Sequence, residues 1–297
     1  MINRSDIEKV ISGRILVNEP MSRHTTFRIG GPCDFFVEIK NQAELTGLLE
    51  LALGNKVPYF IIGCGSNILV KDKGIRGIVI RLAGDFCKVE FNNESVVSGG
   101  GCAIQYFIKR CADNGLGGME FLAGIPGTIG GAVKMNAGTK TGSIDSILKT
   151  VKIMDGNGTI KQVARGEIEF SYRHSGIPEN SIVVLAEFGL KRTEKNDIIK
   201  NLTELINFRT KTQPVGFQNA GCVFRNPPGD FAAMLIDKAG LKGTKIGGAV
   251  VSDIHANYIN NTGDASADDV LKLIQIIKST VKEKFSKELE LEIKIVG

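Results

Sequence analysis

Two glycine-rich segments contain the first residues whose types and spacing suggest chemistry. The shorter segment reads Gly63-Cys64-Gly65-Ser66-Asn67. The longer one runs from Ala123 to Ala132 and is followed by Asn136-Ala137-Gly138. Glycine lets the backbone approach a ligand closely and turn its N–H groups toward phosphate oxygens. Two such loops, separated by tens of residues, suit a dinucleotide with an extended pyrophosphate.

A single Gly-x-Gly is more often a tight turn than a ligand loop, so the prediction depends on the pair. Neither loop matches the two commonest nucleotide folds. No Gly-x-Gly-x-x-Gly opens a helix after a strand, and no Gly-Lys-Ser/Thr follows either loop. We therefore expect a dinucleotide site of another kind. The candidate contact residues are Gly63, Gly65, Ser66, Asn67, Gly124, Pro126, Gly127, Thr128, Gly130, Gly131, Asn136 and Gly138.

Short strands and helices must position these loops. A strand over 58–62 leads into the first loop, and a helix over 103–114 precedes the second. Asn41 with Glu44 predicts the start of a helix that Gly54 ends, and Ser5 with Glu8 predicts a capping box near the N-terminus. A hairpin over 151–163 is expected around Asp155-Gly156-Asn157-Gly158. Helices and strands thus alternate without a regular βαβ period.

A polar, charged stretch at 193–197 marks a plausible domain boundary, because a long amphipathic helix over 197–209 follows it. Beyond this helix we expect a helix over 231–239 and a longer one over 267–285, capped by Ser266 with Asp269. Alternating residues over 289–296 predict a closing strand. The C-terminal part therefore reads as a separate α+β domain.

Composition excludes several classes of protein. The chain has 297 residues, of which 42% are hydrophobic and 23% charged, and a net charge of +5. This mild positive charge favours an anionic ligand but is too scattered for nucleic acid. No apolar stretch approaches the roughly 20 residues of a membrane span, and charges interrupt the N-terminus where a signal peptide is apolar. We therefore expect a cytoplasmic protein that binds neither nucleic acid nor membrane.

Cysteine spacing predicts no metal site. No two of the six cysteines form a Cys-x-x-Cys pair, so neither a zinc knuckle nor a thioredoxin motif is present. In a reducing cytosol these residues are thiols, and most are expected to be small buried hydrophobes.

Eight motifs, taken in order, resemble those of UDP-N-acetylenolpyruvoylglucosamine reductases, and together they span nearly the whole chain. They are His24–Gly31, Gly63–Asn67, Gly124–Gly131, Tyr172–Ser175, Asn219–Pro227, Ala239–Gly243, Val251–Asn257 and Leu289–Glu292. Eight ordered motifs are far more specific than any one of them. The short spacing between Arg173 and Cys222 is similar to that of the family's shorter branch, which lacks an inserted substrate-covering loop.

The resemblance implies an α+β fold. A vanillyl-alcohol-oxidase-type FAD-binding module would occupy 1–194, in two lobes of about 1–82 and 83–194, and an α+β substrate-binding domain would occupy 195–297. It also implies a reaction with non-covalent FAD and with NADPH as co-substrate. Hydride from NADPH passes through the flavin to the enolpyruvyl ether of UDP-N-acetylglucosamine and gives UDP-N-acetylmuramate, a precursor of peptidoglycan.

Three catalytic residues follow from the resemblance. Hydride addition to an unsaturated carboxylate develops an enolate, which needs stabilisation and then a proton. Arg173 would bind the carboxylate through its fork of donors, and Glu292 would assist stabilisation of the enolate. Cys222 stands at the proton-donor position, where many members of the family carry serine. A free thiol has a pKa near 8.5 and can donate a proton at neutral pH.

The resemblance also assigns substrate contacts to Arg209, Lys211 and Asn226, and implies no obligate protein partner. Without the resemblance, Arg173 and the helix-end cations would be ordinary surface charges, and Glu292 an ordinary solvated side chain.

Two other functions remain compatible with the glycine loops. The first is an alcohol or sugar oxidase on the same FAD scaffold, which would not share Arg173, Cys222 and Glu292 in this order. The second is a non-catalytic flavin or nucleotide-sugar sensor, which would bind flavin without turnover.

Overall fold

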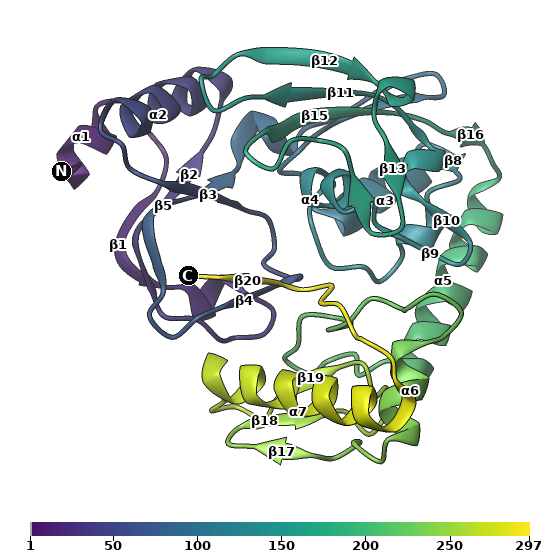
Figure 1. Cartoon of the computed structure of the whole chain (residues 1–297). Coiled ribbons are helices and arrows are strands. Elements are labelled where there is room, and N and C mark those ends of the chain that lie inside the picture. Colours follow the sequence, from purple (N-terminus) through teal and green to yellow (C-terminus); the bar gives the residue numbers. More distant parts are fainter. Residues whose placement is uncertain (1) are drawn as a thin grey trace. The chain divides into compact units, whose positions relative to one another are not determined.

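The computed structural model describes residues 2–297, and its internal contacts group the chain into two compact units (Figure 1). Unit 1 contains the N-terminal residues up to Val17, together with Phe35–Gly63 and Gly77–Phe208. Unit 2 contains Asn18–Asp34, Cys64–Arg76 and Arg209–Gly297. Two short N-terminal segments thus belong with the C-terminal part of the chain. The predicted boundary between 194 and 195 and the two predicted lobes stay predictions.

A four-stranded sheet, most of whose residues belong to unit 1, has the strand order β1-β2-β5-β3, and β3 runs parallel to β5. Helix α2 (Gln42–Gly54) begins at its N-cap Asn41, whose side chain accepts a hydrogen bond from the Glu44 amide, as predicted. Short helix α1 (Arg4–Glu8) precedes the sheet. The strands are β1 (Ile15–Pro20), β2 (Pro32–Ile39), β3 (Tyr59–Ile62) and β5 (Ile75–Leu82).

The second sheet of unit 1 is antiparallel, with the order β12-β11-β15-β7-β6. The predicted hairpin is confirmed as β11 and β12. Helices α3 (Ile104–Asp113) and α4 (Ile129–Lys134) share one hydrophobic core with this sheet. The strands are β6 (Val89–Asn92), β7 (Ser95–Gly99), β11 (Leu148–Met154), β12 (Ile160–Ala164) and β15 (Ile182–Gly189).

Several two-residue strands complete unit 1. The pairs are β8 (Leu116–Gly117) with β16 (Lys191–Arg192), β9 (Gly138–Thr139) with β10 (Gly142–Ser143), and β13 (Phe170–Ser171) with β14 (His174–Ser175).

Unit 2 has a small antiparallel sheet in the order β17-β18-β19, and helix α7 lies along it (Figure 1). Helix α6 packs against α7. Ser266 caps the longer helix in a capping box with Asp269, as predicted. Strand β4 pairs in parallel with the C-terminal strand β20. The elements are β4 (Ile68–Val70), α6 (Ala232–Lys238), β17 (Lys245–Ile246), β18 (Ala249–Val251), β19 (Ile259–Asn261), α7 (Ala267–Phe285) and β20 (Lys294–Val296). Helix α5 (Lys195–Thr212) begins in unit 1, and its last residues belong to unit 2.

Two local predictions are wrong. The N-terminal capping box joins Asn3 with Asp6, two residues before the predicted pair, so α1 begins earlier. The closing strand is only 294–296, and the predicted 289–293 part makes a single bridge, between Leu291 and Phe224. The alternating pattern there reflects burial of Leu289 and Ile293, which are 1% and 3% exposed. Among residues 2–297, no helix is long and apolar enough to cross a membrane.

Candidate active site

The two predicted glycine loops touch within unit 1. A Cβ built on Gly63 would lie 2.6 Å from Oγ1 of Thr128, so a larger residue would force the Thr128 side chain to move. Thr128 is the N-cap of α4, where its side chain accepts a hydrogen bond from the amide of Gly131 at 3.4 Å. Gly124 has a φ of 70°, a conformation that side chains with a Cβ rarely adopt. Glycine-lined backbone from two distant segments therefore meets at the start of α4.

At two positions in and just after the longer segment, packing within the protein is enough to explain why the residue is glycine. A Cβ on Gly130 would lie 2.9 Å from the carbonyl oxygen of Gly100, and one on Gly138 would lie 2.5 Å from that of Gly142. The amide of Gly130 also donates to Gly100 at 2.8 Å. Close backbone packing within the protein therefore accounts for both glycines, whatever they contact in a complex.

The second half of the first loop belongs to unit 2. Gly65 has a φ of 62°, and a Cβ there would lie 2.2 Å from the carbonyl oxygen of His24. Its own carbonyl accepts a hydrogen bond from the Thr26 amide at 3.2 Å. The side chain of Asn67 donates to the carbonyl of Glu292 at 3.2 Å. This loop therefore fixes the backbone of a predicted catalytic residue.

Cys222 and Glu292 lie on neighbouring stretches of unit 2. The amide of Glu292 donates to the carbonyl of Val223 at 2.8 Å, and the amide of Val223 donates to the carbonyl of Asn257, also at 2.8 Å. Three segments that are distant in sequence are thus aligned side by side. They bring Tyr258, which is only 7% exposed, into hydrogen-bonding reach of Cys222 and close enough to Glu292 for its charge to affect the tyrosine.

Tyr258 is the functional candidate that the sequence reasoning missed. Burial raises the pKa of its hydroxyl most, and the interactions with Cys222, including a hydrogen bond, and with Glu292 raise that pKa further, whereas the charge of Arg209 opposes the rise. The hydroxyl therefore keeps its proton at neutral pH and can donate a hydrogen bond to Cys222. Its only signal in the sequence was an aromatic residue directly after the Val251–Asn257 motif.

His255 packs against this tyrosine. The two ring centroids are 4.9 Å apart, with the rings nearly perpendicular at 76°. Burial lowers the pKa of His255, so the imidazole is neutral at neutral pH. Its Nδ1 is buried, and nothing within residues 2–297 hydrogen-bonds to it.

Arg173 lies in unit 1, on the two-residue turn between β13 and β14. Its φ of 56° is unusual for a residue with a Cβ. Nη1 donates to the carbonyl of Gly138 at 2.9 Å, and the guanidinium lies 5.2 Å from the centroid of the Tyr172 ring. The side chain is therefore oriented before any substrate binds.

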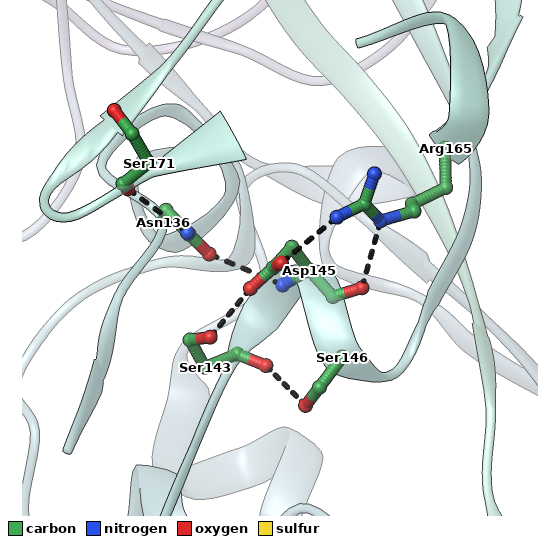
Figure 2. Close-up of polar contacts among 6 residues, drawn as sticks. All are labelled: Asn136, Ser143, Asp145, Ser146, Arg165 and Ser171. Carbon is green, nitrogen blue, oxygen red and sulfur yellow. Dashed lines mark hydrogen bonds and ion pairs between the residues drawn. The ribbon is translucent and has the colours of Figure 1, made fainter. Parts of the chain in front are cut away.

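Asn136 lies beneath this turn (Figure 2). Its Nδ2 donates to the carbonyl of Ser171 at 3.1 Å, and its Oδ1 accepts from the amide of Asp145 at 3.1 Å. Both ends of the amide thus have partners within the protein. A contact between Asn136 and the dinucleotide stays a prediction.

The three predicted substrate contacts all lie in unit 2. Arg209 and Lys211 are in the last turn of α5, and Arg209 is close enough to influence Tyr258. Oδ1 of Asn226 accepts a hydrogen bond from the Ala232 amide at 3.0 Å, which holds the first turn of α6. The contacts of these residues with a substrate stay predictions.

The glycine segments fit a flavin dinucleotide. The Thr128 side chain packs against Gly63 and brings the two loops together, and Gly124, four residues before Thr128, has left-handed backbone without a side chain. Such backbone is suited to a pyrophosphate. Roles for Ser66, Pro126 and Gly127 in this site stay predictions. Among residues 2–297, no three or more His, Cys, Asp or Glu side chains are grouped so that they could hold a metal ion.

Two family models match the chain. The FAD binding domain matches residues 33–164, and the C-terminal domain of UDP-N-acetylenolpyruvoylglucosamine reductase matches residues 213–296. These matches and the observed elements confirm the prediction of an α+β FAD-binding fold. They also identify the protein as an FAD-dependent oxidoreductase.

Similar proteins cover nearly the whole chain. UDP-N-acetylenolpyruvoylglucosamine reductase 1 of Bacillus anthracis is 45% identical and covers 96% of this chain and 95% of its own length. UDP-N-acetylenolpyruvoylglucosamine reductase 2 of Symbiobacterium thermophilum is 42% identical and covers 96% of this chain and 93% of its own length. The reductase structure from Thermus caldophilus is 35% identical, with a TM-score of 0.83, and covers 97% of this chain and 100% of its own.

A glucose dehydrogenase, Phl p 4.0202, shares the fold alone, at 13% identity and a TM-score of 0.50 over 64% of this chain and 44% of its own. The reductase relatives, which cover nearly the whole chain, do not favour the oxidase and sensor alternatives. With relatives above 40% identity over almost its full length, the chain belongs to the UDP-N-acetylenolpyruvoylglucosamine reductase family.

Proposed function

We propose that this protein reduces the enolpyruvyl ether of UDP-N-acetylglucosamine to UDP-N-acetylmuramate, with NADPH as the source of hydride. The cytoplasm, where peptidoglycan precursors are made, is the proposed location. The observation that carries the proposal is the backbone alignment of three segments, in which Cys222, Tyr258 and Glu292 lie on neighbouring stretches of unit 2. Arg209 is close enough to lower the pKa of Tyr258. Those are the residue types that an enolate and an anionic nucleotide sugar require. Bound FAD would accept hydride from NADPH and deliver it to the substrate.

Arg173 binds the carboxylate of the enolpyruvyl group. As hydride reaches the β-carbon, negative charge moves onto this carboxylate, and a fixed guanidinium stabilises it without rearrangement. The hydrogen bond to Gly138 and the contact with Tyr172 hold the guanidinium in advance. A flexible lysine would lose both the orientation and the paired donors.

Cys222 delivers a proton from its sulfur to the α-carbon, which completes the addition of one hydride and one proton across the double bond. Tyr258 remains protonated and supports the thiol through a hydrogen bond. Glu292 assists stabilisation of the enolate. The Asn67 side chain and the Val223 carbonyl hold its backbone in place.

The test is the absorption spectrum of the purified holoenzyme. The protein should carry one non-covalent FAD per chain, and acid should release FAD and no FMN. NADPH should bleach the flavin band, and the enolpyruvyl substrate should then restore it. A protein that is bleached by NADPH but not recoloured by this substrate would overturn the proposal.

A further inference from the structure

The turn that carries Arg173 is conformationally unfavourable. Phe170 pairs with Ser175 and Ser171 with His174, which leaves Tyr172 and Arg173 as a two-residue loop. Arg173 occupies the left-handed region with a φ of 56°, where its Cβ crowds the backbone. Such a conformation persists only where the surroundings impose it.

Three hydrogen bonds dock this turn on one neighbouring segment. Asn136 Nδ2 donates to the Ser171 carbonyl at 3.1 Å, and Ser175 Oγ donates to the Lys134 carbonyl at 2.9 Å. The third is the bond of the Arg173 guanidinium to the Gly138 carbonyl. The segment 134–138 therefore determines where the turn lies.

Asn136 is itself held from the other side. It too is left-handed, with a φ of 43°, and the residue is only 6% exposed. The amide of Asp145 donates to Oδ1 at 3.1 Å, so the opposite end, Nδ2, must face Ser171. The position of Asp145 thus fixes which way the carboxamide points.

Asp145 is clamped by Arg165 (Figure 2). Nη2 of Arg165 contacts Oδ2 of Asp145 at 2.9 Å, and Nε donates to the Asp145 carbonyl at 3.2 Å. Ser143 Oγ donates to the other carboxylate oxygen. The Arg165 guanidinium also lies 5.2 Å from the centroid of Phe170, the first residue of β13. The same arginine therefore contacts both Asp145, which orients Asn136, and Phe170, where the strand leading into the turn begins.

We infer that the Asp145–Arg165 pair is a positioning device for Arg173, acting through Asn136 and Phe170. Neither member of the pair belongs to the proposed catalytic or binding residues. The inference rests on the proposed function, in which Arg173 binds the substrate carboxylate. Hydrogen bonds from Ser143 and Arg165 outweigh the effect of burial and keep the pKa of Asp145 below its ordinary value, so the pair is charged at neutral pH.

The experiment separates the two half-reactions in holoenzyme variants. Asp145→Asn and Arg165→Met should keep their FAD and be reduced by NADPH within about twofold of the wild-type rate. Reoxidation by the enolpyruvyl substrate should slow by about tenfold, since a misplacement of about 1 Å costs up to about 100-fold. Arg165→Lys, which retains the charge, should recover part of this loss. Asp113→Asn, which removes a carboxylate paired with Lys109 elsewhere in unit 1, is the matched control and should change neither rate.

A double-mutant cycle decides whether the pair acts through Arg173. In an Arg173→Ala background, Asp145→Asn should slow reoxidation no further, because the residue being positioned is gone. Additive losses would overturn the inference, as would equal losses in both half-reactions or loss of FAD. If Arg173→Ala slows reoxidation but Asp145→Asn does not, only the positioning role fails. If Arg173→Ala itself reoxidises normally, both the proposed role of Arg173 and this inference fail.

Discussion

At the scale of single residues, the proposed role of the Cys222 thiol as proton donor can be tested in the second half-reaction, the reoxidation of the reduced flavin by the enolpyruvyl substrate. Cys222→Ser should retain substantial activity, because a hydroxyl in the same place can donate a proton. Cys222→Ala should form product about 10²- to 10⁴-fold more slowly, the usual loss for a general acid. Single-turnover reoxidation by the enolpyruvyl substrate measures both variants.

A second thiol provides the control for this prediction. Cys87 is also a free, partly exposed cysteine, but it lies in unit 1 and has no assigned role. Cys87→Ala should turn over like the wild type. If Cys222→Ala also did so, Cys222 would be a packing residue and the proton donor would be another group.

Tyr258→Phe tests the hydrogen bond to Cys222 alone. The ring that packs on His255 remains, and only the hydroxyl is lost. A single hydrogen bond is worth about 0.5–1.5 kcal/mol, so reoxidation should slow by roughly twofold to tenfold while reduction by NADPH stays unchanged. In a Cys222→Ala background the same substitution should have no further effect. An equal slowing there would show that Tyr258 acts independently of the thiol.

The residues of this site differ in how far sequence could identify them. Cys222 and Glu292 could be proposed only from a resemblance between motifs, because a lone cysteine and an acidic residue in an alternating segment are not distinctive. Tyr258 escaped notice because its importance comes from burial beside Cys222 and Glu292, which lie on distant parts of the chain. No local pattern reports such a contact.

At the scale of secondary-structure elements, the start of α2 illustrates what a short pattern can and cannot predict. The helix begins after Asn41, as expected, because an N-cap acts within four residues. The partner of Glu44 was not predictable, since its carboxylate accepts bonds from the amide and hydroxyl of Ser12, 32 residues away in sequence, at 3.1 and 2.6 Å. Its other oxygen accepts from the Lys40 amide at 2.8 Å.

These contacts predict a pH dependence of stability. Burial alone would raise the pKa of Glu44, but the hydrogen bonds from Ser12 and Lys40 outweigh it and hold the pKa below the ordinary value of 4.5. The folded state therefore binds this proton less readily than the unfolded chain. The resulting stabilisation is complete above pH 4.5 and is lost as the pH falls through the lower, folded-state pKa.

Urea unfolding between pH 3 and 6 measures this contribution. As the pH is lowered below 4.5, the urea concentration at which half of the protein is unfolded should decrease more steeply for the wild type than for Glu44→Gln. The variant has no charge to lose at this position. At pH 6 the variant should be the less stable of the two. Parallel pH profiles would contradict the assignment.

At the scale of the whole molecule, sequence could predict the fold class but not the grouping of its segments. The α+β character follows from alternating helix and strand patterns, whereas the association of Asn18–Asp34 and Cys64–Arg76 with the C-terminal part depends on distant contacts. Phe27, Ile29 and Leu69 are at most 2% exposed and belong to the same hydrophobic core as α7. Asp72 also accepts hydrogen bonds from the amides of Ala267 and Asp268 at the start of this helix.

A fragment of residues 195–297 should therefore not fold by itself. It would lack the buried side chains of the two N-terminal segments, and β20 would have no partner strand. We expect little chemical-shift dispersion in its NMR spectrum and no cooperative thermal transition. A fragment that gave both would establish 195–297 as an autonomous domain, in agreement with the boundary expected from sequence.

The parallel pairing of β4 with β20 also has a consequence for synthesis on the ribosome. Strand β4 ends at Val70, and its partner ends at Val296, next to the last residue of the chain. At about 5–20 residues per second, roughly 10 to 45 seconds separate the translation of the two strands. Throughout this interval the apolar segment Ile68–Val70 lacks the strand that it pairs with in the folded protein. It is therefore a segment to which a chaperone could bind, or at which the nascent chain could begin to aggregate.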